Sequence, residues 1–257
     1  MEEGIYISLA AERLFSVYGF PITNTIVASV AIALTLVCVA FISSRRLKLV
    51  PGRFQTAVEG AFEYVFGYVE ETLGSRKLAA RYFPLIATIF LFIFMANMLH
   101  FFPFVGHAIG FENPESHGLA PLLRAPNTDL NTTLALAIIA FLVVEISGIV
   151  TLGLLKYGQK FVNFKAGVMG FIIGLLEIIG NLARLVSLSF RLFGAIFAGE
   201  VLLIIIGFLG PYFLPLPFLF LEVFVGFIQA FIFAMLTLVF IGMSVSHHPD
   251  THQADIS

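Results

Sequence analysis

Four stretches of the chain are apolar and long enough to cross a membrane as single helices. A helix needs about 20 apolar residues to span the hydrocarbon core. Residues 22–42 and 84–102 contain no charge at all. Residues 131–155 are interrupted only by Glu145, and residues 218–245 form the last apolar stretch. Each of these stretches is predicted to be a spanning helix.

A fifth stretch, residues 166–210, is helix-compatible for far longer than a bilayer requires. We therefore expect this helix to tilt strongly or to break. A group of prolines follows it and marks a turn before residues 218–245. The last two helices are predicted to form a long, tilted hairpin.

Residues 53–74 show a different pattern. Apolar residues recur there at helical spacing, with acids elsewhere on the wheel. We interpret this segment as an interfacial helix. The predicted fold is thus an all-α polytopic membrane protein, one membrane domain over residues 1–257, with about five spanning helices and one interfacial helix.

Basic residues predict the orientation, because Lys and Arg collect on the cytoplasmic side. Ten of the 14 Lys and Arg residues lie in residues 43–83 and 156–165. These segments are expected inside, and residues 1–21 and 103–128 outside. The tail, residues 246–257, is then cytoplasmic. No basic n-region precedes an apolar run at the start, so we expect no cleaved signal peptide.

Composition agrees with a membrane protein. The chain is 59% hydrophobic and 12% charged, whereas soluble domains carry about 25% charged residues. A net charge of -2 leaves no basic excess to hold nucleic-acid phosphates, so we expect no nucleic-acid binding. The single cysteine, Cys38, excludes disulfide pairs within the chain and cysteine-based zinc motifs.

Charged residues inside the membrane are costly, so they are functional candidates. Glu177, Arg184 and Arg191 are spaced seven apart, which keeps them near one stripe of the long helix. Glu200 is about half a turn away from Arg191 around the helix. In an antiparallel hairpin, Arg191 should lie level with Gln229, and Glu200 with Glu222. Such a hairpin would carry a carboxylate-lined path that enters from outside and ends at Arg191.

Other interpretations stay open for several of these residues. Arg184 can extend its charge to the cytoplasmic headgroups, and Glu145 can be a paired interior carboxylate. Gln229 can simply join two helices. An ion pair of Arg191 with Glu200 or Glu177 is disfavoured, because buried pairs rarely repay their desolvation.

Histidines offer a weak alternative site. His100, His107 and His117 lie close together in the sequence, so zinc binding is conceivable. The terminal histidines are more simply a solvated tail. We expect no metal and no cofactor, and no soluble-enzyme motif is present.

Three motifs together closely resemble subunit a of F-type ATP synthases. They are SLSFRLFGAIFAGE at 187–200, FIQAFIFAMLT at 227–237 and PNTDLNTT at 126–133. The predicted helix order also matches that family over residues 22–246. The resemblance implies a non-catalytic, proton-translocating stator subunit in a bacterial plasma membrane. It also implies c-ring subunits, peripheral-stalk b subunits and, indirectly, the soluble catalytic head as partners.

The resemblance further implies residue roles. Arg191 would be the essential arginine that faces the ring carboxylate, with Gln229 beside it. Glu200 and Glu222 would serve the external half-channel, and Glu177 the cytoplasmic one. Four more residues are candidates for lining the channels: Glu145, Asp129, Asn131 and Ser187.

Some positions depart from the family pattern. Ala195 stands where many bacterial members have Asn, and Glu222 where His is frequent, so this chain has two acids at one level. Leu185 replaces a frequent Pro and Arg184 a frequent Lys. Two other functions remain possible from the residues alone: a stand-alone transporter or proton channel, and a non-conducting scaffold.

Overall fold

A computed structural model describes residues 13–17, 20–99, 110–112, 119–121, 124–153, 157, 167–210 and 213–245. In these residues, five helices are long and apolar enough to cross a membrane. They are α1 (Asn24–Arg46), α3 (Arg76–Met98), α5 (Leu130–Leu152), α7 (Gly167–Leu209) and α8 (Pro215–Val245). The predicted all-α polytopic membrane fold is confirmed.

The amphipathic helix α2 (Arg53–Leu73) forms where the periodicity predicts it. It ends at Gly74, whose left-handed φ of 64° suits a residue without a side chain. It packs on the bundle from Phe62 onward, with Val69 buried and the rings of Phe62 and Phe66 edge-on to Phe83 of α3. Its location at a membrane surface stays a prediction.

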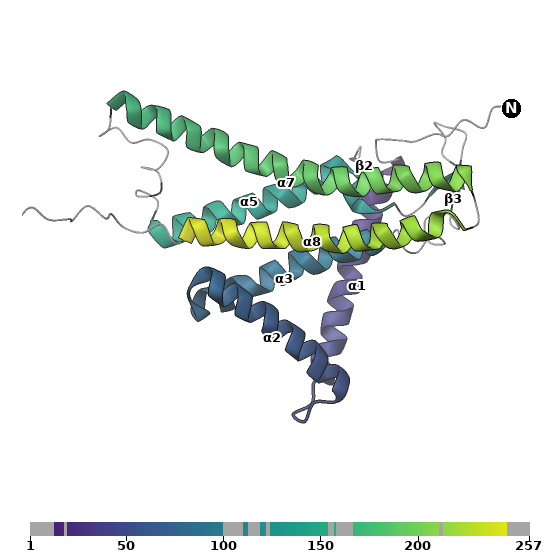
Figure 1. Cartoon of the computed structure of the whole chain (residues 1–257), viewed down its shortest axis with the longest axis horizontal. Coiled ribbons are helices and arrows are strands. Elements are labelled where there is room, and N and C mark those ends of the chain that lie inside the picture. Colours follow the sequence, from purple (N-terminus) through teal and green to yellow (C-terminus); the bar gives the residue numbers. More distant parts are fainter. Residues whose placement is uncertain are drawn as a thin grey trace, which may run out of the picture.

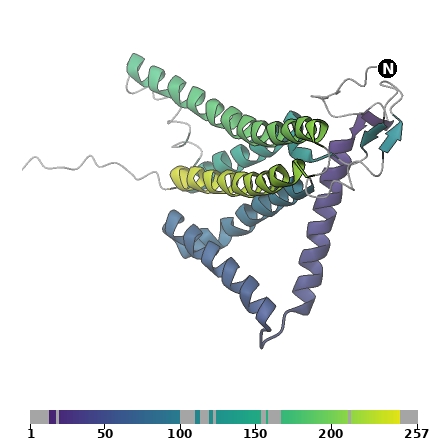
Figure 2. The ribbon, with the colours of Figure 1, turned by 45° about the vertical axis from the view of Figure 1, so that its right-hand side comes forward.

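Helices α1 and α2 project away from the bundle as two sides of a V (Figures 1 and 2). Thr23 caps α1, and its hydroxyl accepts from the amide of Ile26. Buried residues occur only in the first part of α1, up to Ile32. The remainder, including Phe41 and Ile42, is apolar and exposed in the isolated chain.

Helix α3 begins earlier than predicted. It starts at Arg76 rather than at residue 84, and Pro84 lies inside it. The exposed charges of its first turns, such as Arg81, mark the end of the apolar run and not the end of the helix. The length of the charge-free run therefore underestimates the length of a helix that extends beyond the hydrocarbon core of the membrane.

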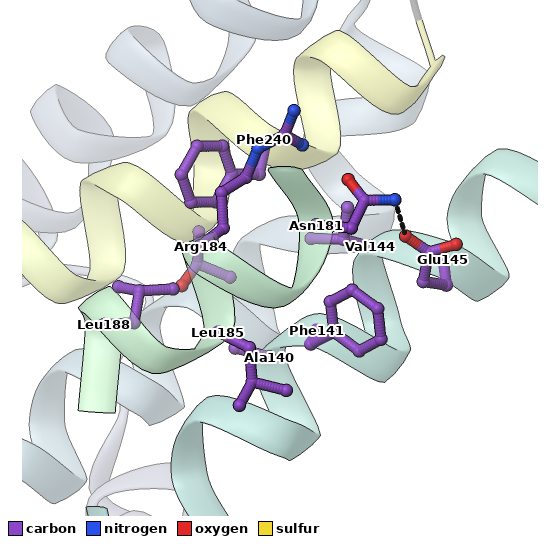
Figure 3. A pocket seen from close by; sticks show the side chains of 10 residues that line it. Ala140, Phe141, Val144, Glu145, Asn181, Arg184, Leu185, Leu188 and Phe240 are labelled. Carbon is purple, nitrogen blue, oxygen red and sulfur yellow. Dashed lines mark hydrogen bonds between the residues drawn. The ribbon is translucent and has the colours of Figure 1, made fainter. Parts of the chain in front are cut away.

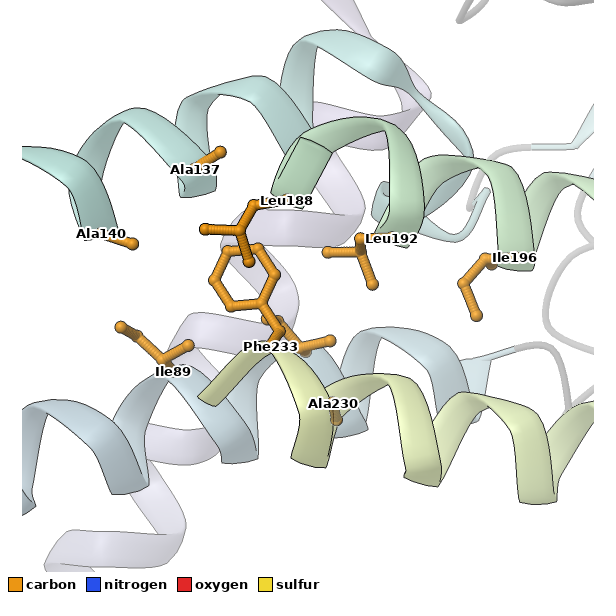
Figure 4. Packing of buried hydrophobic residues seen from close by; sticks show 9 residues of the cluster. Ile89, Ala137, Ala140, Leu188, Leu192, Ile196, Ala230 and Phe233 are labelled. Carbon is orange, nitrogen blue, oxygen red and sulfur yellow. The ribbon is translucent and has the colours of Figure 1, made fainter. Parts of the chain in front are cut away.

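The core lies where α3, α5, α7 and α8 meet (Figure 4). Alanines of α5 and α8 face large side chains of α7 and α8, which lets the helices approach closely. The cluster contains Ile89, Ile93, Ala137, Ala140, Leu188, Leu192, Ile196, Ala230 and Phe233. This packing holds the middle of α7 against α8 and sets the relative position of their polar residues.

Helix α7 is one unbroken helix of 43 residues. It packs against α8 near their connection, and the two helices diverge toward Gly167 and Val245 (Figures 1 and 2). Helix α8 begins at Pro215, three residues before the predicted start at 218. Proline is tolerated in the first turn, where no intrahelical N–H bond is needed. The tilt of this hairpin in a membrane stays a prediction.

Short strands were not expected from the sequence. β1 (Arg13–Val17) pairs antiparallel with β2 (Phe20–Thr23), and β3 (Gly110–Glu112) with β4 (Leu119–Pro121). Strands of three to five residues are too short for an alternating pattern to reveal them. They fall in or next to the segments predicted to lie outside, namely 1–21 and 103–128.

Candidate functional site

Arg191 lies on the exposed side of α7, one turn after Ser187. Its Nη2 donates to the Ser187 hydroxyl at 3.3 Å. In the described part of the chain, no carboxylate forms an ion pair with Arg191. The alternative of a pair with Glu200 or Glu177 therefore does not apply to this conformation. The arginine presents its charge away from the bundle core.

Gln229 joins α8 to α7 at the level of Arg191. Its side-chain Nε2 donates to the backbone carbonyl of Arg191 at 2.9 Å, and Gln229 is buried. The predicted pairing of these two levels is confirmed. Leu192, the next residue of α7, is buried in the core cluster and keeps this turn of the helix in place.

Glu200 forms an ion pair that the sequence did not indicate. Arg124 Nη2 lies 3.0 Å from Glu200 Oε2, and the two side chains are 9% and 21% exposed. Arg124 belongs to the predicted external loop and precedes η2, a 3₁₀ turn over Pro126–Thr128. Arg124 is the only Lys or Arg among residues 103–128. This isolated positive charge was the one sequence feature that could have drawn attention to Arg124.

Glu222 is buried on α8 and faces the α7 backbone. A Cβ atom built on Gly199 would lie 2.9 Å from Glu222 Oε1, so a larger residue at position 199 would force this carboxylate to shift. Because Gly199 precedes Glu200, both acids lie at one level of the hairpin, as predicted. The departure from the frequent His at position 222 thus gives two acids at this level, of which Glu200 forms the ion pair with Arg124.

Two asparagines that were not candidates link α3, η2 and α8 one turn deeper than Glu222. Asn97 Nδ2 donates to the Gly226 carbonyl at 2.8 Å. Asn127 Nδ2 donates to Asn97 Oδ1 at 2.7 Å. Both asparagines are buried. Buried amides need partners, and this network holds α8 against α3 and the loop that carries Arg124.

Asp129 and Asn131 form the start of α5. The Asp129 carboxylate accepts from the Asn131 backbone amide and side chain, at 3.0 and 3.1 Å, which is a helix cap. It also accepts from the Thr25 hydroxyl of α1 at 3.1 Å. These contacts give both residues a structural role, and their part in a channel stays a prediction.

Glu145 of α5 lies at a second polar cluster, toward the diverging ends of α7 and α8. It accepts from the Tyr157 hydroxyl at 2.6 Å and from Asn181 Nδ2 of α7 at 3.2 Å. Burial, with the hydrogen bond to Glu145 and its charge, raises the pKa of Tyr157 above its ordinary value. The phenol therefore stays protonated and donates.

A pocket opens beside this cluster (Figure 3). It is lined by Glu145, Asn181 and Arg184 among apolar side chains of α5, α7 and α8. The Arg184 guanidinium lies over the Phe240 ring, 5.3 Å from its centre. Glu177 is half-buried, one turn before Asn181 on α7. Of the residues predicted to share one stripe of α7, Arg191 therefore points outward, whereas Arg184 lines the pocket.

The proposed histidine site cannot be located, because His100, His107 and His117 lie outside the described residues. Among the residues that are described, no group of three or more His, Cys, Asp or Glu side chains could hold a metal ion.

The fold and these residues define a polytopic helical membrane protein with charged groups at three levels of one helical hairpin. The family model for the ATP synthase A chain matches residues 25–242. The chain therefore belongs to the ATP synthase subunit a family.

Individual relatives agree with this assignment. ATP synthase subunit a of Campylobacter concisus is 37% identical over 222 residues, which cover 84% of this chain and 88% of the relative. Subunit a of Moorella thermoacetica is 34% identical and covers 92% of this chain and 97% of its own length. A relative from Propionigenium modestum, named as sodium ion specific, is 34% identical, covering 92% and 78%.

Proposed function

We propose that the chain is the stator subunit that couples transmembrane proton flow to rotation of a ring of c subunits. The observation that carries this proposal is the position of Arg191. Its charge lies on an exposed face of α7 that is otherwise apolar except for Ser187. A charge that faced only lipid would be unfavourable in free energy. We therefore expect a partner with an opposite charge to contact this face.

The surface around Arg191 suits close contact with another helix. Gly194 and Ala198 follow Arg191 on the exposed face of α7, and a Cβ on Gly194 would meet no atom within 4 Å. Small residues let helices approach closely in a membrane. Only 11% of the residues in the most apolar stretch of α7 are buried in the chain, against 44% for α8. A ring helix with a carboxylate fits this uncovered face.

Two polar regions on either side of Arg191 are suited to be half-channels. Glu200 and Glu222 lie toward the predicted external bend. The pocket with Glu145, Asn181 and Arg184 lies toward the predicted cytoplasmic end, and Glu177 is one turn before Asn181 on α7. The core cluster of α3, α5, α7 and α8 separates the two regions, which would prevent a continuous water path.

Elementary electrostatics gives the mechanism. Arginine keeps its charge at any accessible pH, and a nearby cation favours the ionised form of a carboxylate. A ring carboxylate that reaches Arg191 would therefore release its proton to the exit path. Away from Arg191 it would face lipid, where the neutral form is favoured. Protons then travel with the ring, and each charge crossing 100 mV supplies about 2.3 kcal/mol.

This function assigns catalysis to other subunits. The peripheral-stalk b subunits and the soluble catalytic head would be the further partners of the chain. The proposed location is a bacterial plasma membrane, with the N-terminus outside and the C-terminus in the cytoplasm. The chain itself would bind no cofactor.

The test is ATP-driven acidification of inside-out vesicles in which this chain is the only subunit a. Arg191→Ala should abolish pumping while the ring still co-purifies with the complex. Arg81→Ala, an exposed arginine at the start of α3, is the matched control and should pump normally. Normal pumping by Arg191→Ala, or proton flux through the purified chain alone, would contradict the proposal.

A further inference from the structure

Two buried hydroxyl groups join α5 to α7 beside the turn that carries Arg191. Thr133 Oγ1 of α5 and Ser189 Oγ of α7 lie 3.2 Å apart, and both residues are fully buried. Thr133 also donates to the Leu130 carbonyl of its own helix, at 3.1 Å. A hydroxyl carries a single hydrogen, so Ser189 is the donor to Thr133. This bond connects two helices in the interior of the bundle.

Ser189 lies on the side of α7 that faces away from Arg191. Two residues along a helix place side chains about 160° apart around its axis. Ser189 is buried accordingly, whereas Phe190 and Arg191 are exposed. Helix α5 therefore holds the back of α7, while Gln229 of α8 binds the Arg191 carbonyl. Two directional bonds from two different helices thus meet α7 at residues 189 and 191.

We propose that Ser189 and Thr133 are positioning residues that fix the rotation of α7 about its own axis, so that Arg191 points at the ring. This inference rests on the proposed function and adds an anchor on the side of α7 opposite to the ring. Arg191 remains the group that meets the ring carboxylate.

Apolar packing would not fix this rotation by itself. Hydrophobic contacts are non-directional, and only 11% of the most apolar stretch of α7 is buried in the chain. Ala137, one turn after Thr133, and Leu188 of α7 lie in the core cluster (Figure 4). A hydrogen bond is directional, so it distinguishes rotations that such packing tolerates. A ring that turns against Arg191 would push on α7, and this bond would resist the push from the opposite side.

Matched substitutions separate the hydroxyl groups from the packing. Thr133→Val keeps the shape and loses the hydroxyl, whereas Thr133→Ser keeps the hydroxyl and loses a methyl group. Ser189→Ala removes the other hydroxyl. Thr133→Val and Ser189→Ala should let α7 rotate, and Thr133→Ser should behave like the parent. Ser147→Ala is the control, because buried Ser147 of α5 donates within its own helix, to the Val143 carbonyl.

The measurement is the number of protons pumped per ATP hydrolysed in inside-out vesicles, together with the passive proton leak without ATP. Ring co-purification checks assembly. Losing one hydrogen bond between membrane helices changes the population of a misaligned state by roughly threefold. We therefore expect the leak to rise about threefold in Thr133→Val and in Ser189→Ala, and the coupling ratio to fall.

The double variant Thr133→Val/Ser189→Ala distinguishes positioning from stability. It removes both hydroxyl groups, so neither loses its partner, and the thermal dissociation of the complex should approach that of the parent. The anchor is still absent, so the leak should stay high and the coupling ratio low. A merely structural role would restore the coupling ratio together with the stability.

The proposal is overturned if Ser189→Ala keeps the parental leak and coupling ratio in assembled complexes, or if Thr133→Val is better coupled than Thr133→Ser. It is also overturned if the double variant regains parental coupling, or if Ser147→Ala raises the leak as much. Failure of the proposed function is recognised separately, because then Arg191→Ala would pump normally in the same vesicles.

Discussion

The side-chain amide of Gln229 donates to the backbone carbonyl of Arg191 at 2.9 Å. This single bond connects α8 to the turn of α7 that carries the exposed guanidinium. Together with the core packing of Leu192, the bond fixes the height of Arg191 relative to the glutamates near the bend. Arg191 itself donates to Ser187, so its position depends on one contact from each helix.

Replacing Gln229 should loosen this connection. Gln229→Leu removes the donor and should lower the stability of the hairpin by about 1 kcal/mol, the usual scale for a hydrogen bond between helices in a membrane. We expect slower pumping together with a higher passive proton leak. Both are measured in vesicles with and without ATP. An unchanged leak and rate would mean that the bond does not position Arg191.

Gly199 should tolerate no large side chain, because Glu222 Oε1 lies where a Cβ would extend. Gly199→Leu should separate α7 from α8 and cost about 1–3 kcal/mol, as overpacking does. Heat-induced dissociation of the detergent-solubilised complex measures this loss. Gly207→Ala on the same helix is the control, since nothing lies within 4 Å of its Cβ position. Equal stability of the two variants would contradict the predicted close contact.

Tyr157→Phe tests the second polar cluster. It removes the donor to Glu145 and should cost about 1–2 kcal/mol. Because the pKa of Tyr157 is raised in the folded chain, its contribution is fully present below the ordinary tyrosine pKa of about 10 and is lost as the pH rises further. The difference in thermal stability between parent and variant should be constant from pH 7 to 9 and shrink at higher pH. A difference that grows with pH would have the wrong sign.

Asn97→Leu should destabilise the outer part of the bundle. It removes the donor to Gly226 and the shorter of the two bonds that Asn127 donates to α3, leaving the 3.4 Å bond to the Ile93 carbonyl. Buried polar groups that lose partners cost about 1–3 kcal/mol. Thermal dissociation of the complex is the measurement, and Thr88→Val, at an exposed position of α3, is the control. Stability equal to the parent would argue against the network.

Much of the fold follows from the sequence, because long apolar runs have few alternatives in a membrane. The sequence could predict that Arg191 lies level with Gln229, and Glu200 with Glu222. Once the position of the bend in an antiparallel hairpin is known, it determines which residues of the two helices lie at the same height. Helix ends were less predictable. The start of α3 at Arg76 depends on where charges can reach water, which an apolar run does not record.

The contacts of the site were harder to predict. Arg124 and Glu200 are 76 residues apart, and no local pattern connects them. The link from Asn127 through Asn97 to Gly226 of α8 likewise depends on packing among three elements. Asp129 could be recognised within a motif, but its role as a cap and its bond to Thr25 of α1 appear only in the folded chain.

The central claim is that the face of α7 around Arg191 meets the ring. Photo-cross-linking tests it most directly. The reagent is attached to Ala198→Cys, two turns beyond Arg191 on the exposed face, in a Cys38→Ser background. In a separate control without either substitution, the reagent is attached to the native Cys38, which is exposed on α1. We predict capture of a ring subunit from position 198 and not from position 38, in complexes that still pump. Capture of the ring from Cys38 alone would contradict the account.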